Sequence, residues 1–290
     1  MSVPRVSILI PTYNRAGTIS IALQSALNQD LGHIEVIVSD NDSTDLSLDH
    51  IRSFNDSRIK LIRQDSNIGM ALNWIECIKH ARGEWIAFLM SDDLFLNNCI
   101  AYRFNLSTFY PDAIVIQSMG MALPLCDLSS ALKRDEESYQ ALEHFSYDEI
   151  ICMLSGRPSP YPSNPCSFLI KTEFIKQFIE SVAFRQYLIE TSYSGHCLDH
   201  MLLYGTFLMA NRGSFIRTGK IDYVTSIHPL QDSSVYGRKI FFLIAGNFRA
   251  AALLCRICKI SQIRRVQIML YHFYSALRQL AYSIFKVSRR

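Results

Sequence analysis

Runs of apolar residues alternate with amphipathic segments through the first hundred residues of this 290-residue chain. The apolar runs predict strands at residues 6–10, 34–39, 58–62 and 85–90. Between them, apolar residues recur at helical spacing, which predicts helices with one buried face: Ile19, Ala22, Leu23, Ala26 and Leu27, then Ala71, Leu72, Ile75 and Ile78. Strands and helices in this alternation predict a parallel, right-handed βαβ sheet flanked by helices.

Polar residues follow two of these strands at the point where each should leave the core. Ser39-Asp40-Asn41-Asp42 ends one strand and Ser91-Asp92-Asp93 ends another. Carboxyl ends of parallel strands share one edge of a sheet, so both segments and Tyr13 are expected there together. Carboxylates are costly to bury without partners, and oxygen ligands suit hard cations. This edge is therefore a candidate site for a divalent metal and a charged substrate.

The second half of the chain is less regular. Strands are expected at residues 113–118 and 166–170, and helices at 172–178 and 201–209, whereas 132–144 reads as a charged surface segment. Four prolines within residues 156–165 predict an irregular loop. The expected organisation is one α/β domain over residues 1–232, with halves 1–112 and 113–232, followed by a helical tail over 233–290.

Charge divides the chain in the same way. All 26 acidic residues lie at or before Asp232, together with 18 of the 29 Lys and Arg, and the remaining eleven basic residues follow it. An acidic body argues against a nucleic-acid-binding domain. Residues 240–254 and 263–285 read as basic amphipathic helices, which predicts binding of residues 236–290 to an anionic membrane surface. A helical pair packed on the body or on a second subunit is the alternative.

Localisation follows from features that the sequence lacks. It shows no signal peptide and no apolar run of about 18 residues, the length that spans a bilayer. Eight scattered cysteines suit reduced thiols, and Cys255 with Cys258 alone is a weak metal signal. We expect a cytoplasmic protein associated peripherally with the inner face of the membrane.

Four segments, at residues 6–14, 39–45, 67–74 and 83–93, together resemble a GT-A glycosyltransferase of family 2. The resemblance implies a Rossmann-like mixed, mainly parallel sheet and a nucleotide-sugar donor, with UDP-sugars favoured. It also implies that donor-binding residues lie at matching positions. These are Pro11, Tyr13, Asp40, Asn41 and Asp42 for the base and ribose, and Asn67, Gly69, Asn73, Ser91 and Asp92 around the rest of the donor. Asn41 and Ser91 stand where the family usually has Asp.

The same resemblance assigns the chemistry. Asp93 would ligate Mn²⁺ or Mg²⁺ at the diphosphate, Asp92 would lie near the ribose, and His228 matches a histidine near the metal. Asp199 matches the general base that deprotonates the acceptor hydroxyl, with His196 and His200 as rivals. Helix capping is the structural alternative for Asp40, Asp42 and the Asp92–Asp93 pair.

The implied enzyme is an inverting glycosyltransferase that adds one sugar to a saccharide acceptor, expected to be lipid-linked, in O-antigen or capsule synthesis. The Q-x-x-R-W signature of processive relatives is absent, because both tryptophans, Trp74 and Trp85, lie in the first third. Two alternatives remain. A sugar-phosphate nucleotidyltransferase should carry a Gly-rich basic loop after the first strand, whereas residues 11–18 hold one Gly and one Arg. A non-catalytic scaffold would not need Asp93 and Asp199.

Overall fold

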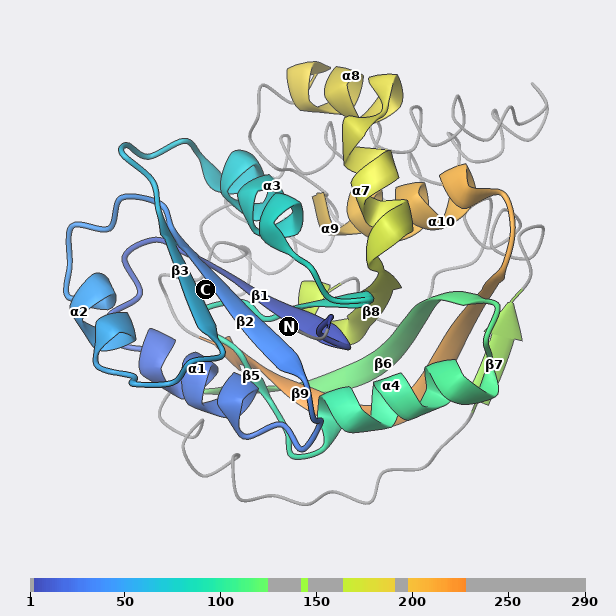
Figure 1. Cartoon of the computed structure of the whole chain (residues 1–290), viewed down its shortest axis with the longest axis horizontal. Coiled ribbons are helices and arrows are strands. Elements are labelled where there is room, and N and C mark those ends of the chain that lie inside the picture. Colours follow the sequence, from blue (N-terminus) through green and yellow to red (C-terminus); the bar gives the residue numbers. More distant parts are fainter. Residues whose placement is uncertain (1–2, 125–141, 146–163, 191–197, 228–290) are drawn as a thin grey trace, which may run out of the picture.

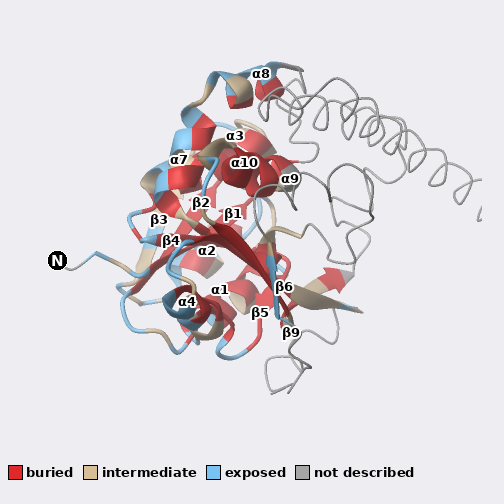
Figure 2. Cartoon of the chain, turned by 90° about the vertical axis from the view of Figure 1, so that its right-hand side faces the viewer, coloured by how far each residue is buried: buried red, intermediate tan, exposed pale blue. Residues whose placement is uncertain are grey.

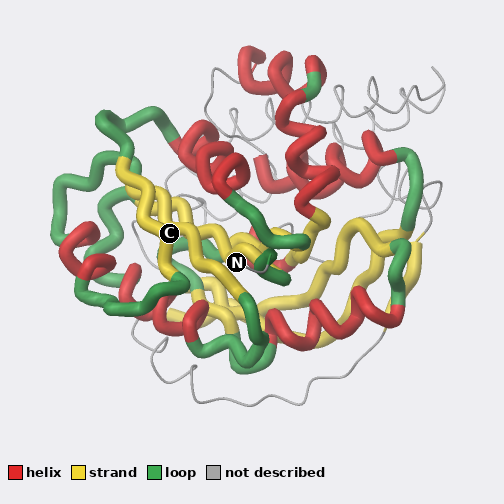
Figure 3. Tube along the Cα trace, viewed as in Figure 1, coloured by secondary structure: helices red, strands yellow, loops and turns green. Residues whose placement is uncertain are grey.

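A mixed β-sheet lies between two layers of helices in the computed structural model (Figures 1 and 3). The structure describes residues 3–124, 142–145, 164–190 and 198–227. Within these residues one sheet contains nine strands, in the order β3-β2-β1-β4-β8-β6-β9-β5, with β7 paired to β9. The strands are β1 (Val6–Thr12), β2 (Ile34–Asp40), β3 (Ile59–Arg63), β4 (Trp85–Phe88), β5 (Leu94–Phe95), β6 (Ala113–Pro124), β7 (Leu142–Phe145), β8 (Phe168–Lys171) and β9 (Ser214–Ile227).

The first four strands confirm the expected parallel sheet. β1 pairs in parallel with β2 and β4, and β2 pairs in parallel with β3. Their residues alternate between two cores: Leu9 belongs to one cluster, and Ile8 and Ile10 belong to the other. This is the two-residue period of a strand that is buried on both faces. The long apolar runs in the sequence come from this double burial.

The helices cover the two faces separately, as Figure 2 shows by the buried residues that line the sheet on either side. One face carries α3 (Met70–His80), α7 (Thr172–Glu180), α8 (Val182–Glu190), α9 (Leu198–His200), the π-helical turn η3 (Met201–Gly205) and α10 (Thr206–Ala210). The other carries α1 (Ile19–Leu27), α2 (Ser47–Arg52) and α4 (Cys99–Phe109). The fold class expected from the sequence, a mixed and mainly parallel sheet flanked by helices, is confirmed.

Several elements differ in detail from the pattern-based expectations. β4 ends at Phe88 rather than residue 90, and the 166–170 strand is the 3₁₀ turn η2 (Pro165–Ser167) followed by β8. β8 runs antiparallel to both β4 and β6, whereas β9 runs parallel to β6. The end of the expected charged surface segment is strand β7, and α4, α8 and β9 were not predicted. β9 was not predicted because polar residues interrupt the alternation of apolar residues along it.

β5 is a two-residue strand whose outer edge is covered by side chains, and no other described strand pairs with that edge. Phe95 N–H donates to Ser25 Oγ at 3.1 Å, and Gln29 Nε2 donates to the Leu96 carbonyl at 3.0 Å. Its inner edge pairs with β9, where Leu94 faces Val224. Polar side chains from α1 and the loop after it therefore satisfy the backbone groups that an open edge would expose.

Candidate active site

The carboxyl ends of β1, β2 and β4 meet at one edge of the sheet, as the sequence predicted. Thr12 lies opposite Asp40 in the β1–β2 register, and Asn41 N–H donates to the Thr12 carbonyl at 2.9 Å. Leu89 N–H donates to the Leu9 carbonyl at 2.9 Å, which carries the pairing one residue beyond β4. Tyr13, Asp42 and the residues after β4 thus emerge side by side.

The loop after β1 is fixed to the loop after β2. Asn14 has a left-handed φ of 50°, its N–H donates to Ser43 Oγ at 3.0 Å, and its Oδ1 accepts from Thr44 N–H at 2.8 Å. Arg15 N–H donates to Ser47 Oγ at 2.7 Å. These bonds hold the backbone of residues 14–15 while Tyr13 keeps 40% of its surface exposed. An exposed aromatic ring on a fixed loop can stack on a nucleobase.

Asp40 and Asn41 both use their side chains within the protein. The Asp40 carboxylate accepts from Ser43 Oγ at 2.5 Å and from Ser43 N–H at 3.2 Å, so it caps the turn after β2. Asn41 Nδ2 donates to Asn67 Oδ1 at 3.0 Å, and Asn41 Oδ1 accepts from Ile68 N–H at 2.9 Å. Asn41, which stands where the family usually has Asp, therefore ties the loop before α3 to β2.

The residues expected on the remaining donor side also support the backbone. Asn73 is buried on α3; its Oδ1 accepts from Ser39 Oγ at 2.7 Å, and its Nδ2 donates to the Ser39 carbonyl at 3.1 Å. Gly69 has a φ of 84°, a conformation that favours glycine, where the chain turns into α3. Trp74 packs against Phe88 with ring centroids 5.2 Å apart and belongs to the core.

The turn that follows β4, residues 90–93, is here called the acid turn. Asp93 N–H closes it by donating to the Met90 carbonyl at 2.9 Å. The Asp92 Oδ2 lies 3.7 Å from Nε of Arg15, so the acid turn faces the loop after β1. The Asp92–Asp93 pair precedes strand β5 rather than a helix, which rules out the helix-capping alternative for these two residues.

Asp93 points into the protein, where three groups contact its carboxylate. Oδ1 accepts from Ser226 N–H of β9 at 3.0 Å, and Oδ2 lies 3.4 Å from both Asn164 Nδ2 and Cys166 Sγ. Burial and then the negative charge of Asp92 raise the pKa of Asp93 to about 7, although these hydrogen bonds lower it. Burial and repulsion between the two carboxylates therefore disfavour a second negative charge on the acid turn, and a bound cation would relieve this repulsion.

These surroundings fit a divalent cation. The described residues contain no cluster of three or more His, Cys, Asp or Glu that could hold a metal by itself. A site with one or two carboxylates is nevertheless how Mg²⁺ is usually held when substrate phosphates supply other ligands. Hard carboxylate oxygens, and the repulsion between the two carboxylates of the acid turn, match that chemistry. His228, the other expected ligand, lies outside the described residues.

Sequence reasoning missed the residues that hold the acid turn. Cys166 Sγ accepts from Met90 N–H at 3.3 Å, and Asn164 also donates to Thr225 Oγ1 at 2.8 Å. Asn164 and Cys166 flank a proline, and Ser226 contributes only its backbone, so no local signal marks them. Arg15 could have been found, because it is the one basic residue in the loop directly after β1.

Asp199 lies in the first turn of the short helix α9, as predicted from the sequence, and is half-buried. The preceding Leu198 is buried in the same core cluster as Phe88 and Phe168, which packs α9 onto the face covered by α3 and α7. His200 ends α9, and His196 lies outside the described residues. An Asp at a helix N-terminus is stabilised as the anion.

The mixed, mainly parallel sheet flanked by helices is a GT-A-like fold, shared with the solved structures compared below. Residues 7–125 match the family described as glycosyl transferase family 2, so this part of the chain is a family 2 glycosyltransferase domain. The resemblance inferred from the sequence is confirmed over these residues.

Two curated relatives illustrate the similarity. The *Escherichia coli* protein UDP-Glc:alpha-D-GlcNAc-diphosphoundecaprenol beta-1,3-glucosyltransferase WfgD is 41% identical over 93 residues, which cover 32% of this chain and 37% of the relative. The succinoglycan biosynthesis protein ExoO of *Rhizobium meliloti* (strain 1021) is 41% identical over 91 residues, covering 31% of this chain and 26% of the relative. The chain thus matches well under half the length of these relatives.

Solved structures share the fold over more of the chain. *S. aureus* TarS 1–349 in complex with UDP has a TM-score of 0.62 at 18% identity, over 91% of this chain and 69% of TarS 1–349. The mannosyltransferase PcManGT from *Pyrobaculum calidifontis*, in complex with GDP-Man and Mn²⁺, has a TM-score of 0.58 at 16% identity, over 99% and 80%. None of the described helices is long and apolar enough to cross a membrane.

Proposed function

We propose that this protein is an inverting, metal-dependent glycosyltransferase that moves one sugar from a nucleoside-diphosphate sugar to a hydroxyl of a lipid-linked saccharide. The observation that carries the proposal is the acid turn, which faces the fixed loop after β1 across the 3.7 Å contact between Asp92 and Arg15. The family 2 domain over residues 7–125 supports the reaction class.

The donor and acceptor classes rest on the similar proteins. Solved structures with this fold are complexes with UDP, UDP-GlcNAc or GDP-Man, and WfgD is named as a transferase from UDP-Glc to a diphosphoundecaprenol-linked GlcNAc. We favour a UDP-sugar donor and an undecaprenol-type acceptor in bacterial surface-polysaccharide synthesis. The basic residues at 236–290 would hold the enzyme at the inner face of the membrane, where such an acceptor is embedded.

In this proposal the donor lies across the carboxyl edge of the sheet. Tyr13 stacks on the base, Pro11 and Asp42 line the base and ribose, and the Asp40, Asn41, Asn67, Gly69 and Asn73 network keeps the surrounding loops in place. Ser91 and Asp92 face the sugar-nucleotide side of the acid turn. Asp93, with His228, would hold Mn²⁺ or Mg²⁺, which when bound neutralises the charge that develops on the leaving diphosphate.

Asp199 supplies the other half of the reaction. Its carboxylate takes the proton from the acceptor hydroxyl as the oxygen attacks the anomeric carbon from the face opposite the leaving diphosphate. General base catalysis of this kind typically contributes about 10²–10⁴-fold to the rate. We therefore expect Asp199→Asn to lose activity by about this factor while donor binding is retained.

Titration calorimetry with UDP, GDP and their sugars, with and without Mn²⁺, tests the donor assignment. Wild-type protein should bind one nucleotide class with an affinity that depends on Mn²⁺, and Asp93→Asn should lose that dependence. Asp49→Asn, at an exposed position of α2, is the matched control and should bind like wild type. Equal metal dependence in Asp93→Asn would remove Asp93 from the metal site. If the protein instead released pyrophosphate from a nucleoside triphosphate and a sugar phosphate, it would be a nucleotidyltransferase and the proposed sugar transfer would be wrong.

A further inference from the structure

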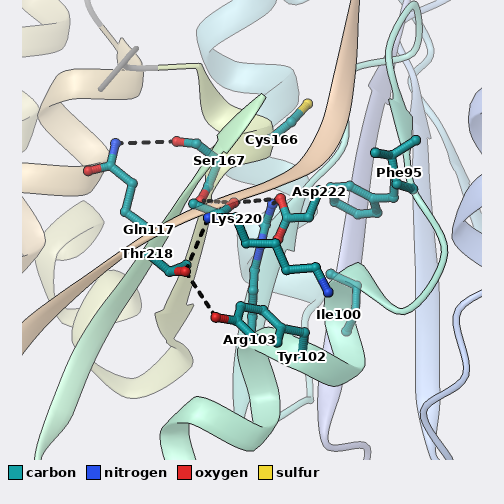
Figure 4. A network of polar contacts seen from close by, with 12 residues as sticks. Phe95, Ile100, Tyr102, Arg103, Gln117, Cys166, Ser167, Thr218, Lys220 and Asp222 are labelled. Carbon is teal, nitrogen blue, oxygen red and sulfur yellow. Dashed lines mark hydrogen bonds and ion pairs between the residues drawn. The ribbon is translucent and has the colours of Figure 1, made fainter. Parts of the chain in front are cut away.

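A buried ion pair joins α4 to β9 (Figure 4). Arg103 donates from Nε to Asp222 Oδ2 at 2.9 Å and from Nη2 to Asp222 Oδ1 at 2.5 Å, and both side chains have no exposed surface. Ser118 Oγ donates to the same Asp222 Oδ1 at 2.6 Å. The ion pair is therefore bidentate, and the hydrogen bond from Ser118 links it to β6 as well.

Stability alone does not account for this pair. Ion pairs in protein interiors lose much of their attraction to desolvation, and apolar residues of similar volume often serve stability as well. The cost of removing the Arg103 guanidinium from water is only partly compensated here. Its Nη1 is buried without a hydrogen-bond partner in the described part of the chain. A pair of this kind is better explained by the geometry that it fixes.

The geometry in question is the register of β9. Pairing between β6 and β9 is irregular: Gln117 faces Arg217, but two residues later Met119 faces Ile221, so β9 carries extra residues at this level. The register shifts again between Met119 and Gly120, which face Ile221 and Tyr223, so Asp222 lies at the end of this irregular segment and has no register partner in β6. Tyr102 of α4 holds the segment itself, through a 2.9 Å hydrogen bond between its hydroxyl and Thr218 Oγ1 (Figure 4).

Beyond Asp222, β9 runs beside the acid turn and β5. The Asp222 carbonyl accepts from Leu96 N–H at 2.9 Å, Val224 faces Leu94, and Ser226 N–H donates to Asp93 Oδ1. A slip of one residue would reverse which side of β9 each N–H and side chain faces. Ser226 would then turn its N–H away from Asp93.

We propose that Arg103 and Asp222 are positioning residues that set the register of β9 past its irregular segment and thereby hold the acid turn in the form that binds a metal–nucleotide diphosphate. This inference rests on the proposed function for its ligand. Removing the second layer of contacts around a metal ligand typically lowers metal affinity by about 10- to 100-fold. The pair should have an effect of this size although it lies outside the site.

The test is the double variant Arg103→Met with Asp222→Leu, studied by Mn²⁺ titration in the presence of UDP. Apolar replacement should leave the thermal unfolding midpoint near that of wild type, whereas Mn²⁺–UDP affinity should fall by about 10- to 100-fold. Arg103→Lys keeps the positive charge but cannot form the bidentate pair. It is a milder second variant and should lose part of the Mn²⁺–UDP affinity. Arg82→Met breaks the ion pair to Glu35 at the opposite edge of the sheet and is the matched control. Folded variants that bind Mn²⁺–UDP like wild type would overturn the inference.

A second readout separates this inference from the proposed function. Deuterium exchange of the peptide spanning residues 222–227 reports the β9 register without any ligand. Exchange there should be faster in both Arg103 variants and unchanged in Arg82→Met. If wild type does not bind Mn²⁺–UDP, the nucleotide-sugar proposal fails, and unchanged exchange in the Arg103 variants would overturn the positioning role independently.

Discussion

Asp92 and Asp93 are neighbours in the sequence but have different surroundings. The side chain of Asp92 is 11% exposed and faces Arg15, whereas the residue Asp93 is 3% exposed and contacts Ser226 and Cys166. The structure therefore separates a carboxylate at the surface of the site from one that is held by the second half of the sheet. The Arg15 guanidinium lies 3.7 Å from the Asp92 carboxylate, and its charge should affect how the pair binds a metal.

Replacing Arg15 with Ala should tighten the binding of Mn²⁺ alone. The guanidinium partly neutralises Asp92, so a metal must compete with it. Because partly exposed ion pairs are worth about 0.2–1 kcal/mol, the expected gain is about 1.4- to fivefold in affinity. Electron paramagnetic resonance of free Mn²⁺ measures it, with Arg52→Ala on the exposed surface of α2 as control. Weaker Mn²⁺ binding in Arg15→Ala would show that Arg15 organises the acid turn instead of competing for it.

The pairing of β6 with β9 is the longest strand pairing in the second half of the described sheet. It requires a residue without a side chain at Gly120, because a Cβ there would lie 2.3 Å from the ring of Tyr223. Tyr223 is buried between Asp222 and Val224, so a residue that moves it also moves the strand beside the acid turn.

Gly120→Ala should destabilise the protein by about 1–3 kcal/mol through overpacking. Urea unfolding measures the change, and Gly32→Ala, where a Cβ would meet nothing within 4 Å, is the control. Combining Gly120→Ala with Tyr223→Leu should restore part of the loss. A Gly120→Ala variant as stable as wild type would mean that Tyr223 can move without cost.

The amino ends of β1, β2 and β4 are joined by Glu35. Burial raises its pKa, but hydrogen bonds from Ser7 and Arg82 and the positive charge of Arg82 outweigh burial, and the net shift is downward. A carboxyl with a lowered folded-state pKa stabilises the fold above its unfolded pKa, and this stability is lost as pH falls through the folded value.

The unfolding free energy of wild type should therefore decrease as pH falls below the usual glutamate value of 4.5. Glu35→Gln should flatten this part of the pH profile and should cost about 1–3 kcal/mol at pH 7, because hydrogen bonds to a charged group are lost. Urea unfolding between pH 3 and 7 measures both. If the unfolding free energy of Glu35→Gln fell at low pH as it does in wild type, that loss of stability would come from other carboxylates.

At the scale of the whole molecule, a single sheet joins two halves that differ in regularity, with one core on each face. The proposed membrane contact involves residues 236–290, outside the described residues, and rests on their charge: eleven basic residues follow the last acidic one. An acidic body and a basic tail predict an orientation in which the tail faces anionic lipid.

Reversing two tail charges, Arg264→Glu with Arg265→Glu in the full chain, should weaken binding to phosphatidylglycerol vesicles by at least tenfold, since each basic residue near such a surface contributes about 1 kcal/mol. Vesicle flotation measures it. Arg52→Glu with Lys60→Glu makes the same charge change on exposed residues of the body and should float like wild type. Equal flotation of all three proteins would place the tail against the body or a partner instead.

The sequence alone determined the parallel part of the sheet, β1 to β4. Four parallel strands and the shared edge of Tyr13, Asp40 and the acid turn followed from local apolar runs, since strands buried on both faces leave an uninterrupted signal. The four short motifs then identified the family 2 domain. The sequence also placed Asp199 at a helix start.

Only the tertiary structure decided what holds the acid turn. Ser226 and Asp93 are 133 residues apart, and Arg103 and Asp222 are 119 apart. Such contacts depend on how β9 pairs with β6 and β5, and irregular pairing leaves no period in the sequence from which it could be read. Two adjacent Asp residues after a strand predicted a site from the sequence, but the separate roles of Asp92 and Asp93 depend on β9, the strand that lies beside them.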